Sequence, residues 1–410
     1  MNSRERVLAA LSHREADRVP IDLSGHRSSG ISALLYPKLR ACLGLPLGPV
    51  RVYDPIQQLA VVDEDVLDLL GVDTIELGRG FALRVEDWSD WVLPDGTPCQ
   101  MPAWSRPERE PGRWVLRSKT GRVMAHLPDG ALFFEQTYFP FAETFELEAL
   151  PQAMEECAWC AAASPPGPLI AGTGGHLLLR EGALRLRSAT DRAILGLFGG
   201  NLLEMGQYLF GNEKFLYLLA ADPRLVHAFL DRLLERHLKD LEDYLRAVGD
   251  VIDVIVFGDD LGMQTGPQIS PRMYREFFKP RQAALWSKVK ERTGLRIMLH
   301  CCGGVRPLLP DLIEAGLDAI NPVQISARGM DPGELKREFG RELVFWGGGC
   351  ETQHWLPDLP VEDVRRHVLD LLRIWQPGGG YVFQVVHNIL PLVSAENVVA
   401  VFGTVRSFRP

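Results

Sequence analysis

From residue 251 onward, short apolar runs alternate with longer amphipathic segments. The runs are rich in Val, Ile and Phe, and each ends in Gly or a polar residue: VIDVIVFGDD (251–260), RIMLHCCGG (296–304), DAINPVQ (318–324), LVFWGGGC (343–350) and YVFQVVHN (381–388). Between them, segments such as VEDVRRHVLDLLRIW (361–375) carry an apolar residue every three or four positions, the spacing of an amphipathic helix. Strands alternating with helices predict βαβ units and a parallel sheet.

Three earlier apolar runs extend this pattern toward the N-terminus: DTIEL (73–77), PLIAGTG (168–174) and RAILGLFGG (192–200). They bring the number of expected strands to about eight, the number that closes a TIM barrel. An open doubly wound sheet is the alternative, but no GxGxxG follows the first strand. We therefore expect an α/β protein with a TIM (β/α)8 barrel, as a single domain over residues 1–410.

Residues 81–140 have a different pattern. LRVEDWSDWVLPDGTPCQMP and GRWVLRSKTGRVMAHLPDG alternate apolar and polar residues, and DG and TG turns interrupt them. This pattern is typical of antiparallel strands joined by tight turns. It predicts a β-meander inserted into the barrel domain.

Composition excludes several classes of protein. The chain has 410 residues, 46% of them hydrophobic and 24% charged, which is typical of a globular protein with a large core. A net charge of −9 without a long basic run argues against nucleic-acid binding. The charged N-terminus and the lack of an apolar stretch of about 18 residues predict no signal peptide and no membrane span, and hence a cytoplasmic location. Seven cysteines without framework spacing predict reduced thiols, available for metal binding or catalysis.

Polar side chains follow the apolar runs, where the active site of a TIM barrel lies. They are Asp259, Asp260, His300, Cys301, Cys302, Gln324, Cys350, Glu351, His387 and Asn388. Because side chains alternate along a strand, His300 and Cys302 point the same way and Cys301 points away. A His-x-Cys pair can bind zinc, and a catalytic zinc site needs three protein ligands. Cys350 and His387 are the candidates for the third, and Asp259 or Asp260 can serve as a ligand, a partner of a ligand or a proton carrier.

Five segments together resemble the uroporphyrinogen decarboxylase superfamily. They are ERVLAALSHREADRVPID, GDDLGMQTGPQISPRMYREFFKP, LHCCGGVRPLLPDLIEAGLDAINPVQ, FWGGGCETQ and GGGYVFQVVHNILPLVSAENV. The resemblance implies a TIM barrel and one of two activities, decarboxylation in heme synthesis or zinc-dependent methyl transfer with a corrinoid protein. The methyltransferase branch, typified by methylcobamide:coenzyme M methyltransferases, uses a His-x-Cys pair and a distant Cys as zinc ligands. His300 and Cys302 match the pair; the distant ligand corresponds to Cys350 by chemistry, or falls close to His387 by position.

The chain departs from what the resemblance implies for the decarboxylase branch. That branch holds its many substrate carboxylates with an Arg-rich N-terminal stretch and stabilises the pyrrole cation with an Asp after an early strand. Here the corresponding SGHRSSGIS offers only Arg27, and the early strand DTIELGRG offers Glu76 and Arg79. We therefore expect a zinc-dependent methyltransferase that moves a methyl group between a methoxy, methylamine or thiol compound and a corrinoid on a separate protein.

The expected zinc ligands are His300, Cys302 and Cys350, with His387 as the alternative third ligand. Asp259 and Asp260 are the expected catalytic residues, and the expected substrate-binding residues are Arg27, Glu76, Gln324, Glu351 and His387. Two alternatives remain: a metal-independent decarboxylase, in which Asp260 and Arg27 handle a carboxylated substrate, and a non-catalytic barrel subunit. The direction of transfer and the oligomeric state stay open.

Overall fold

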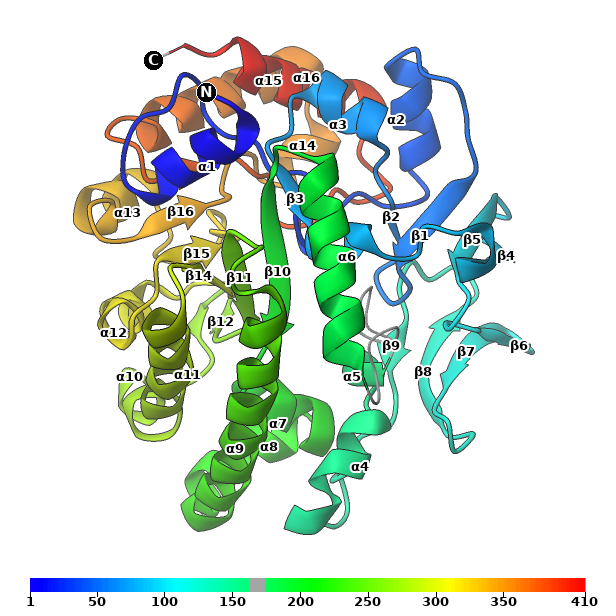
Figure 1. Cartoon of the computed structure of the whole chain (residues 1–410), viewed down its shortest axis with the longest axis vertical. Helices are drawn as coiled ribbons and strands as arrows, with labels where there is room; N and C mark the ends of the chain where they lie inside the picture. Colours follow the sequence, from blue (N-terminus) through cyan, green and yellow to red (C-terminus); the bar gives the residue numbers. More distant parts are fainter. Residues whose placement is uncertain (162–173, 410) are drawn as a thin grey trace.

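The computed structural model of the chain describes residues 1–161 and 174–409 (Figure 1). The strand expected at 168–174 lies, apart from its last residue, outside the described residues. Among the described residues, no helix combines the length and the apolar character that crossing a membrane requires.

Within the described residues, seven strands form one strongly curled parallel sheet. In spatial order they are β3 (Thr74–Glu76), β10 (Ala193–Gly199), β11 (Val254–Gly258), β14 (Arg296–His300), β15 (Ala319–Asn321), β16 (Val344–Trp346) and β17 (Tyr381–Val382). This confirms the α/β class and the parallel sheet. The order follows the sequence without reversal, which excludes the doubly wound alternative, because a doubly wound sheet reverses its order at a switch point.

The segment Pro20–Asp22 links the two edges of the curled sheet. The backbone N–H of Asp22 donates to the carbonyl of Phe383, just past β17, and the N–H of Phe383 donates to the carbonyl of Pro20, both at 2.8 Å. On its other side, Ile21 accepts a hydrogen bond from the N–H of Asp73, directly before β3, also at 2.8 Å. The early apolar run of the sequence therefore lies between the first and last strands of the sheet.

Helix α1 (Ser3–Leu11) covers one end of the sheet. Its Val7, Ala10 and Leu11 pack in a buried cluster with side chains from inside the curl, among them Val254 and Met298. These partners belong to the strands, whose carboxyl ends lie at the opposite end. The helix therefore fills the N-terminal end of the sheet, and the carboxyl-terminal end remains for function.

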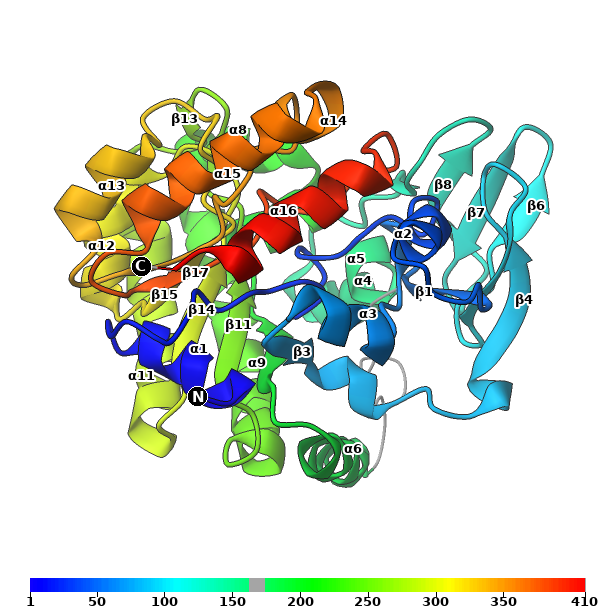
Figure 2. The ribbon, with the colours of Figure 1, turned by 90° about the horizontal axis from the view of Figure 1, so that it is seen from above.

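The remaining helices pack outside the sheet or over its carboxyl end. They are α2 (Tyr36–Cys42), α3 (Glu64–Leu70), α4 (Leu150–Glu155), α5 (Ala158–Ala161), α6 (Gly175–Ala189), α7 (Leu203–Phe210), α8 (Asn212–Ala221), α9 (Pro223–Val248), α10 (Pro271–Met273), α11 (Lys279–Arg292), α12 (Leu309–Ala315), α13 (Pro332–Phe339), α14 (Trp355–Asp358), α15 (Val361–Trp375) and α16 (Ala395–Ser407). Figure 2 shows α15 and α16 side by side across the outside of the fold.

Short strands between residues 50 and 136 form two small sheets beside the curled sheet (Figure 2). One has the order β2-β1-β5-β4 and the other β6-β7-β8-β9, with bounds β1 (Val50–Asp54), β2 (Leu59–Ala60), β4 (Trp88–Val92), β5 (Pro98–Pro102), β6 (Glu108–Glu110), β7 (Arg113–Arg117), β8 (Val123–Pro128) and β9 (Glu135–Gln136). The strands expected at 81–140 are thus antiparallel to their chain neighbours, while β5 also pairs in parallel with β1. A further hairpin, β12 (Gly262–Met263) and β13 (Gly266–Pro267), follows β11.

A buried carboxylate secures the link between the sheet edges. Asp73 has no exposed surface and accepts hydrogen bonds from the Arg6 guanidinium at 2.6 Å, from Arg18 at 2.7 Å and from the backbone N–H of Ile21 at 2.9 Å. A buried charge is tolerated only when it is paired and hydrogen-bonded. Asp73 therefore joins α1, the Pro20–Asp22 segment and β3.

Replacing Asp73 with Ala should lower the free energy of unfolding by about 3–5 kcal/mol, because it leaves two buried or half-buried arginines without their partner. Urea denaturation followed by circular dichroism measures this loss. The matched control is Asp250→Ala, which removes the partner of Arg180 from an exposed ion pair and should cost less than about 1 kcal/mol. Equal losses in the two variants would contradict the role of Asp73.

Candidate metal centre and adjoining cavity

Three side chains converge at the carboxyl end of the curled sheet. His300 ends β14, Cys302 follows two residues later, and His387 lies in the loop after β17. One ligand atom from each lies within 4.8 Å of the others, and the Cys302 Sγ is 3.5 Å from the His300 Nε2. All three are half-buried. Two imidazoles and a thiol at this separation form a donor set suited to zinc.

Cys350, expected as third ligand ahead of His387, is not in this group of described residues. Its thiol is fully buried in the hydrophobic core, directed at the carbonyl of Glu351 at 3.7 Å, and burial raises its pKa. The cause is the backbone after β16, which leaves the extended conformation at Gly347 (φ 120°) and Gly348 (φ 67°). The alternation of side chains along the strand therefore does not extend to Cys350, and the side chain that lies with His300 and Cys302 is that of His387, the expected alternative.

His300 is held in one tautomer by Asn321, at the end of the neighbouring strand. The His300 Nδ1 is 2.8 Å from the Asn321 Oδ1. The amide nitrogen of Asn321 donates to the carbonyl of Trp346 at 2.9 Å and to the Gln384 Oε1 at 2.6 Å, so its oxygen must be the atom facing His300. His300 therefore carries its hydrogen on Nδ1 and directs the lone pair of Nε2 at Cys302. This is the arrangement that orients metal-binding histidines.

The chain of hydrogen bonds continues to the loop after Pro20–Asp22. Gln384 donates from its amide nitrogen to the carbonyl of Ser28 at 3.0 Å, which leaves its Oε1 to accept from Asn321 and from the His26 Nε2, 3.3 Å away. The His26 Nδ1 accepts the N–H of Ser28. Both ring nitrogens of His26 are thus used within the protein, and burial holds its pKa well below the ordinary value. His26 supports the chain and does not act as a ligand.

The protonation states bear on metal binding. Burial, together with the neighbouring His300, lowers the pKa of His387 to about 3, so its imidazole is neutral and can donate a lone pair. Burial and the carboxylate of Asp260 raise the pKa of the Cys302 thiol well above its ordinary value. A metal ion must displace this proton, since the thiolate is the ligand form. The three residues fit zinc in number, in donor type and in the orientation of His300.

The two predicted catalytic acids have different environments. Asp259 is fully buried and accepts the N–H groups of Leu203 at 3.2 Å and Glu204 at 2.9 Å, in the first turn of α7. Burial raises its pKa to about 7. Asp260 accepts the N–H of Cys302 at 2.7 Å and lies 3.8 Å from the His300 Nε2. Asp260 therefore borders the three-residue group, whereas Asp259 caps a helix.

Two of the predicted substrate-binding residues, Gln324 and Glu351, accept hydrogen bonds from backbone N–H groups. Gln324 accepts the N–H of Gly303 at 2.9 Å. The buried carboxylate of Glu351 accepts three backbone N–H groups at the start of α14, from Gln353, His354 and Trp355. Both residues shape the loops around the site through these bonds.

Arg27 and Glu76, the predicted substrate-binding residues in the N-terminal part of the chain, lie close to each other. Arg27 forms an ion pair with the buried Asp54 at 2.6 Å and lies over the ring of Trp159, 5.3 Å from its centroid. Burial raises the pKa of Glu76 to about 8. Arg27 lines the large cavity described next, and Glu76 lines a small neighbouring one.

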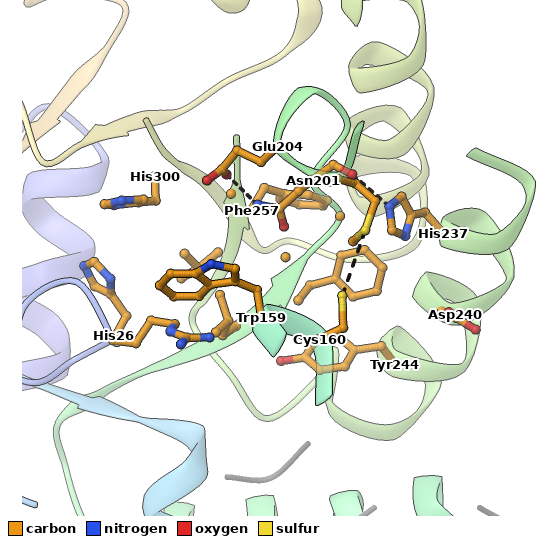
Figure 3. Close-up of a pocket in the computed structure, with 18 of the residues that line it drawn as sticks. His26, Trp159, Cys160, Asn201, Glu204, His237, Asp240, Tyr244, Phe257 and His300 are labelled. Atoms are coloured by element: carbon orange, nitrogen blue, oxygen red, sulfur yellow. Dashed lines mark hydrogen bonds between the residues drawn. The ribbon is translucent and has the colours of Figure 1, made fainter. Parts of the chain in front are cut away.

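A cavity of about 840 Å³ adjoins the three-residue group. His300, His387, Asp260 and Arg27 line it, and Figure 3 shows it extending from His300 and His26 toward Asp240 and Tyr244 on α9. Its walls are strongly aromatic, with Trp159, Phe198, Tyr208, Tyr244 and Phe257. Its size and apolar walls are those of a small-molecule site.

Several cavity residues were missed by sequence reasoning. Asn201 and Glu204 follow the apolar run 192–200, so the test of what comes after each strand would have found them there. Trp159 comes from α5, outside any strand end, and had no comparable signal in the sequence. Asn321 and Gln384 lie within the predicted strand-end segments but were not recognised as partners of a ligand.

Comparison with known proteins gives three findings. A family model described as Uroporphyrinogen decarboxylase (URO-D) matches residues 185–408. The curated uroporphyrinogen decarboxylase of Rhodococcus jostii (strain RHA1) is 27% identical over 207 residues, 47% of this chain and 53% of that protein. That of Coxiella burnetii (strain Dugway 5J108-111) is 23% identical over 233 residues, 55% of this chain and 61% of that protein. The chain thus spans between about half and three fifths of the length of these curated relatives.

Among solved structures, a methyltransferase from Methanosarcina mazei is similar over 100% of this chain and 99% of its own, with a TM-score of 0.60 and 19% sequence identity. At this level of identity the similarity is one of fold. It extends over the whole chain, including the part that precedes residue 185.

Removing the partner of His300 should weaken metal binding. In Asn321→Ala, His300 is free to change tautomer, and zinc affinity should fall about 10–100-fold, as measured by competition with a chromogenic chelator. Asn212→Ala, at an exposed position at the start of α8, is the control. Equal zinc affinity in Asn321→Ala and the control would contradict the proposed orientation of His300.

Proposed function

The chain belongs to the uroporphyrinogen decarboxylase family, and from this premise we propose that it is a zinc-dependent methyltransferase. It moves a methyl group between a small methylated compound and a corrinoid carried by a separate protein. The observation that carries the proposal is the group of His300, Cys302 and His387 beside the cavity. We also interpret Pro20–Asp22 as the eighth element of a TIM (β/α)8 barrel, because it bonds to both edges of the sheet.

The donor set supports a catalytic metal role. His300, Cys302 and His387 would hold a zinc ion through three protein donors, the number typical of catalytic zinc sites, and both His300 and His387 line the cavity. A bound zinc ion supplies Lewis acidity toward a heteroatom of the substrate, either a thiol or the oxygen or nitrogen that bears the methyl group. Asp260 accepts the backbone N–H of Cys302 and places a carboxyl group 3.8 Å from the His300 Nε2.

The charges of the cavity favour this function over decarboxylation of a polycarboxylate. Among its described lining residues the arginines are Arg27 and Arg236, each paired with an aspartate. Acidic residues Glu204, Asp243 and Asp260 also line it. A macrocycle with eight carboxylates would meet repulsion here, whereas a neutral or cationic methyl donor would not. The aromatic walls provide apolar contact for such a donor.

The function requires that zinc and activity depend on the same residues. In the double variant His300→Ala, Cys302→Ser, zinc content by elemental analysis should fall to background. Methyl transfer to free cob(I)alamin, followed by visible absorption with methoxylated aromatics, methylamines and thiols, should also be lost. His387→Ala should lose zinc as well, because it removes the third ligand.

Cys350→Ala is the matched control, since it removes a buried cysteine that lies outside the three-residue group. The folded variant should keep its full zinc content. Retention of zinc by the double variant, or its loss from folded Cys350→Ala, would disprove the ligand assignment.

A further inference from the structure

Glu204 is an acid in the cavity that the metal group does not use. It lies in the first turn of α7 and lines the same cavity as His300, His387 and Asp260. Figure 3 shows Glu204 and His300 toward the same end of this cavity, away from Asp240 and Tyr244. A donor bound at this end of the cavity with its heteroatom toward the metal group would therefore also face the side on which Glu204 lies.

The carboxyl of Glu204 is fixed in position by two hydrogen bonds. The hydroxyl of Tyr208, one turn further along α7, donates to its Oε1 at 2.6 Å. The amide nitrogen of Asn201 donates to its Oε2 at 2.6 Å. In both bonds the carboxyl is the acceptor, so neither occupies a proton that Glu204 carries. That proton is available to a molecule in the cavity.

The surroundings of Glu204 favour its protonated form. Ordinarily an acid in the first turn of a helix gains from the N–H groups there. Here, however, the carboxylate of Asp259 takes the N–H groups of Leu203 and Glu204. Burial, then the negative charges of Asp260 and Asp259, raise the pKa of Glu204 to about 8. Besides acting on these acids, the charge of Glu204 acts electrostatically on the Tyr208 hydroxyl and on the thiols of Cys301 and Cys302.

We propose that Glu204 is the catalytic acid that delivers a proton to the heteroatom as it loses its methyl group. This role rests on the methyltransferase function proposed above. It assigns the proton transfer to Glu204 and not to Asp259, which is enclosed in the α7 cap, or to Asp260, which lies against the metal group with its Oδ1 3.8 Å from the His300 Nε2.

The step balances as follows. The bond between the methyl carbon and the oxygen or nitrogen of the donor breaks, and its electron pair stays on the heteroatom. The methyl carbon bonds to the reduced corrinoid, which provides the electron pair for the new bond as cobalt(I). The heteroatom takes the proton of Glu204, and the resulting carboxylate, stabilised by Tyr208 and Asn201, regains a proton from solvent. General acid catalysis of this kind typically contributes about 10²–10⁴-fold in rate.

The test compares leaving groups that do and do not need a proton. Para-substituted anisoles are offered with free cob(I)alamin to the zinc-loaded enzyme and to Glu204→Gln. With anisole, whose phenolate is basic and therefore a poor leaving group unless it is protonated, the rate of the variant should fall about 10²–10⁴-fold. With 4-nitroanisole, whose phenolate is stable without a proton, the loss should be much smaller. Trimethylamine and tetramethylammonium form the corresponding nitrogen pair, since tetramethylammonium releases a neutral amine.

The control is Glu213→Gln, an exposed acid in the first turn of the next helix, α8. It should behave as wild type with every donor. Zinc content should be unchanged in both variants. At pH 7, the infrared difference spectrum of wild type minus Glu204→Gln should show the carbonyl stretch of one protonated carboxyl, whereas wild type minus Glu213→Gln should not, because the contributions of Asp259 and Glu76 cancel in both differences.

Two results overturn the role of Glu204 alone. One is that Glu204→Gln transfers methyl groups at the wild-type rates, with the wild-type dependence of rate on the leaving group; the other is that this variant loses its zinc. A wild-type enzyme that transfers methyl groups from none of the methoxylated aromatics, methylamines and thiols overturns the proposed function, and the role of Glu204 with it. The outcomes are distinguishable, because the first set requires an active wild type and the second an inactive one.

Discussion

The structure depends on the hydrogen bonds by which Pro20–Asp22 ties together the edges of the curled sheet. On one side of this segment, the buried carboxylate of Asp73 binds the N–H of Ile21. On the other, the carboxylate of Asp22 accepts from the indole of Trp346 at 2.7 Å and the hydroxyl of Thr74 at 2.8 Å. Strands from opposite edges are thereby joined through one short segment. The loop that follows it supplies the backbone of Ser28, which positions Gln384, and through Asn321 the hydrogen-bond chain reaches His300. Closure of the sheet and orientation of a candidate metal ligand are thus parts of one network.

The three acids at the carboxyl end of the curled sheet differ in their hydrogen-bond partners, and hence in what each can do. Asp259 accepts hydrogen bonds from the first N–H groups of α7, and Asp260 accepts one from the backbone N–H of Cys302. Glu204 accepts hydrogen bonds from the side chains of Asn201 and Tyr208 beside the cavity. Burial, together with the nearby carboxylate of Asp260, raises the pKa of Asp259 and of Glu204, so ionising both at neutral pH carries a cost. Glu204 combines a place in the cavity wall with a pKa raised to about 8, and this combination suits an acid that gives a proton to a molecule in the cavity.

The family match and the cavity do not coincide along the chain. Residues 185–408 contain His300, Cys302, His387 and Glu204. Arg27 and Trp159, which form part of the cavity wall, precede this region. The matched region therefore contains the three-residue group and Glu204, whereas the N-terminal part of the chain contributes to the cavity wall. The full-length similarity of fold to the Methanosarcina mazei methyltransferase shows that this N-terminal part also belongs to the architecture.

Periodicity in the sequence by itself determined the parallel strands, and side-chain alternation selected His300 and Cys302 and turned Cys301 into the core. These features are local, because a strand repeats every two residues and a single strand end presents both side chains. Only the tertiary structure decided the third member of the group. The glycines before Cys350 break the strand geometry, and His387 reaches the site from a loop with a left-handed backbone (φ 66°). Likewise, nothing local shows that Asp259 satisfies the first N–H groups of α7, or that Asn321 and Gln384 orient His300. Each of these roles depends on a partner from another part of the chain, and its position is known only once the sheet has curled.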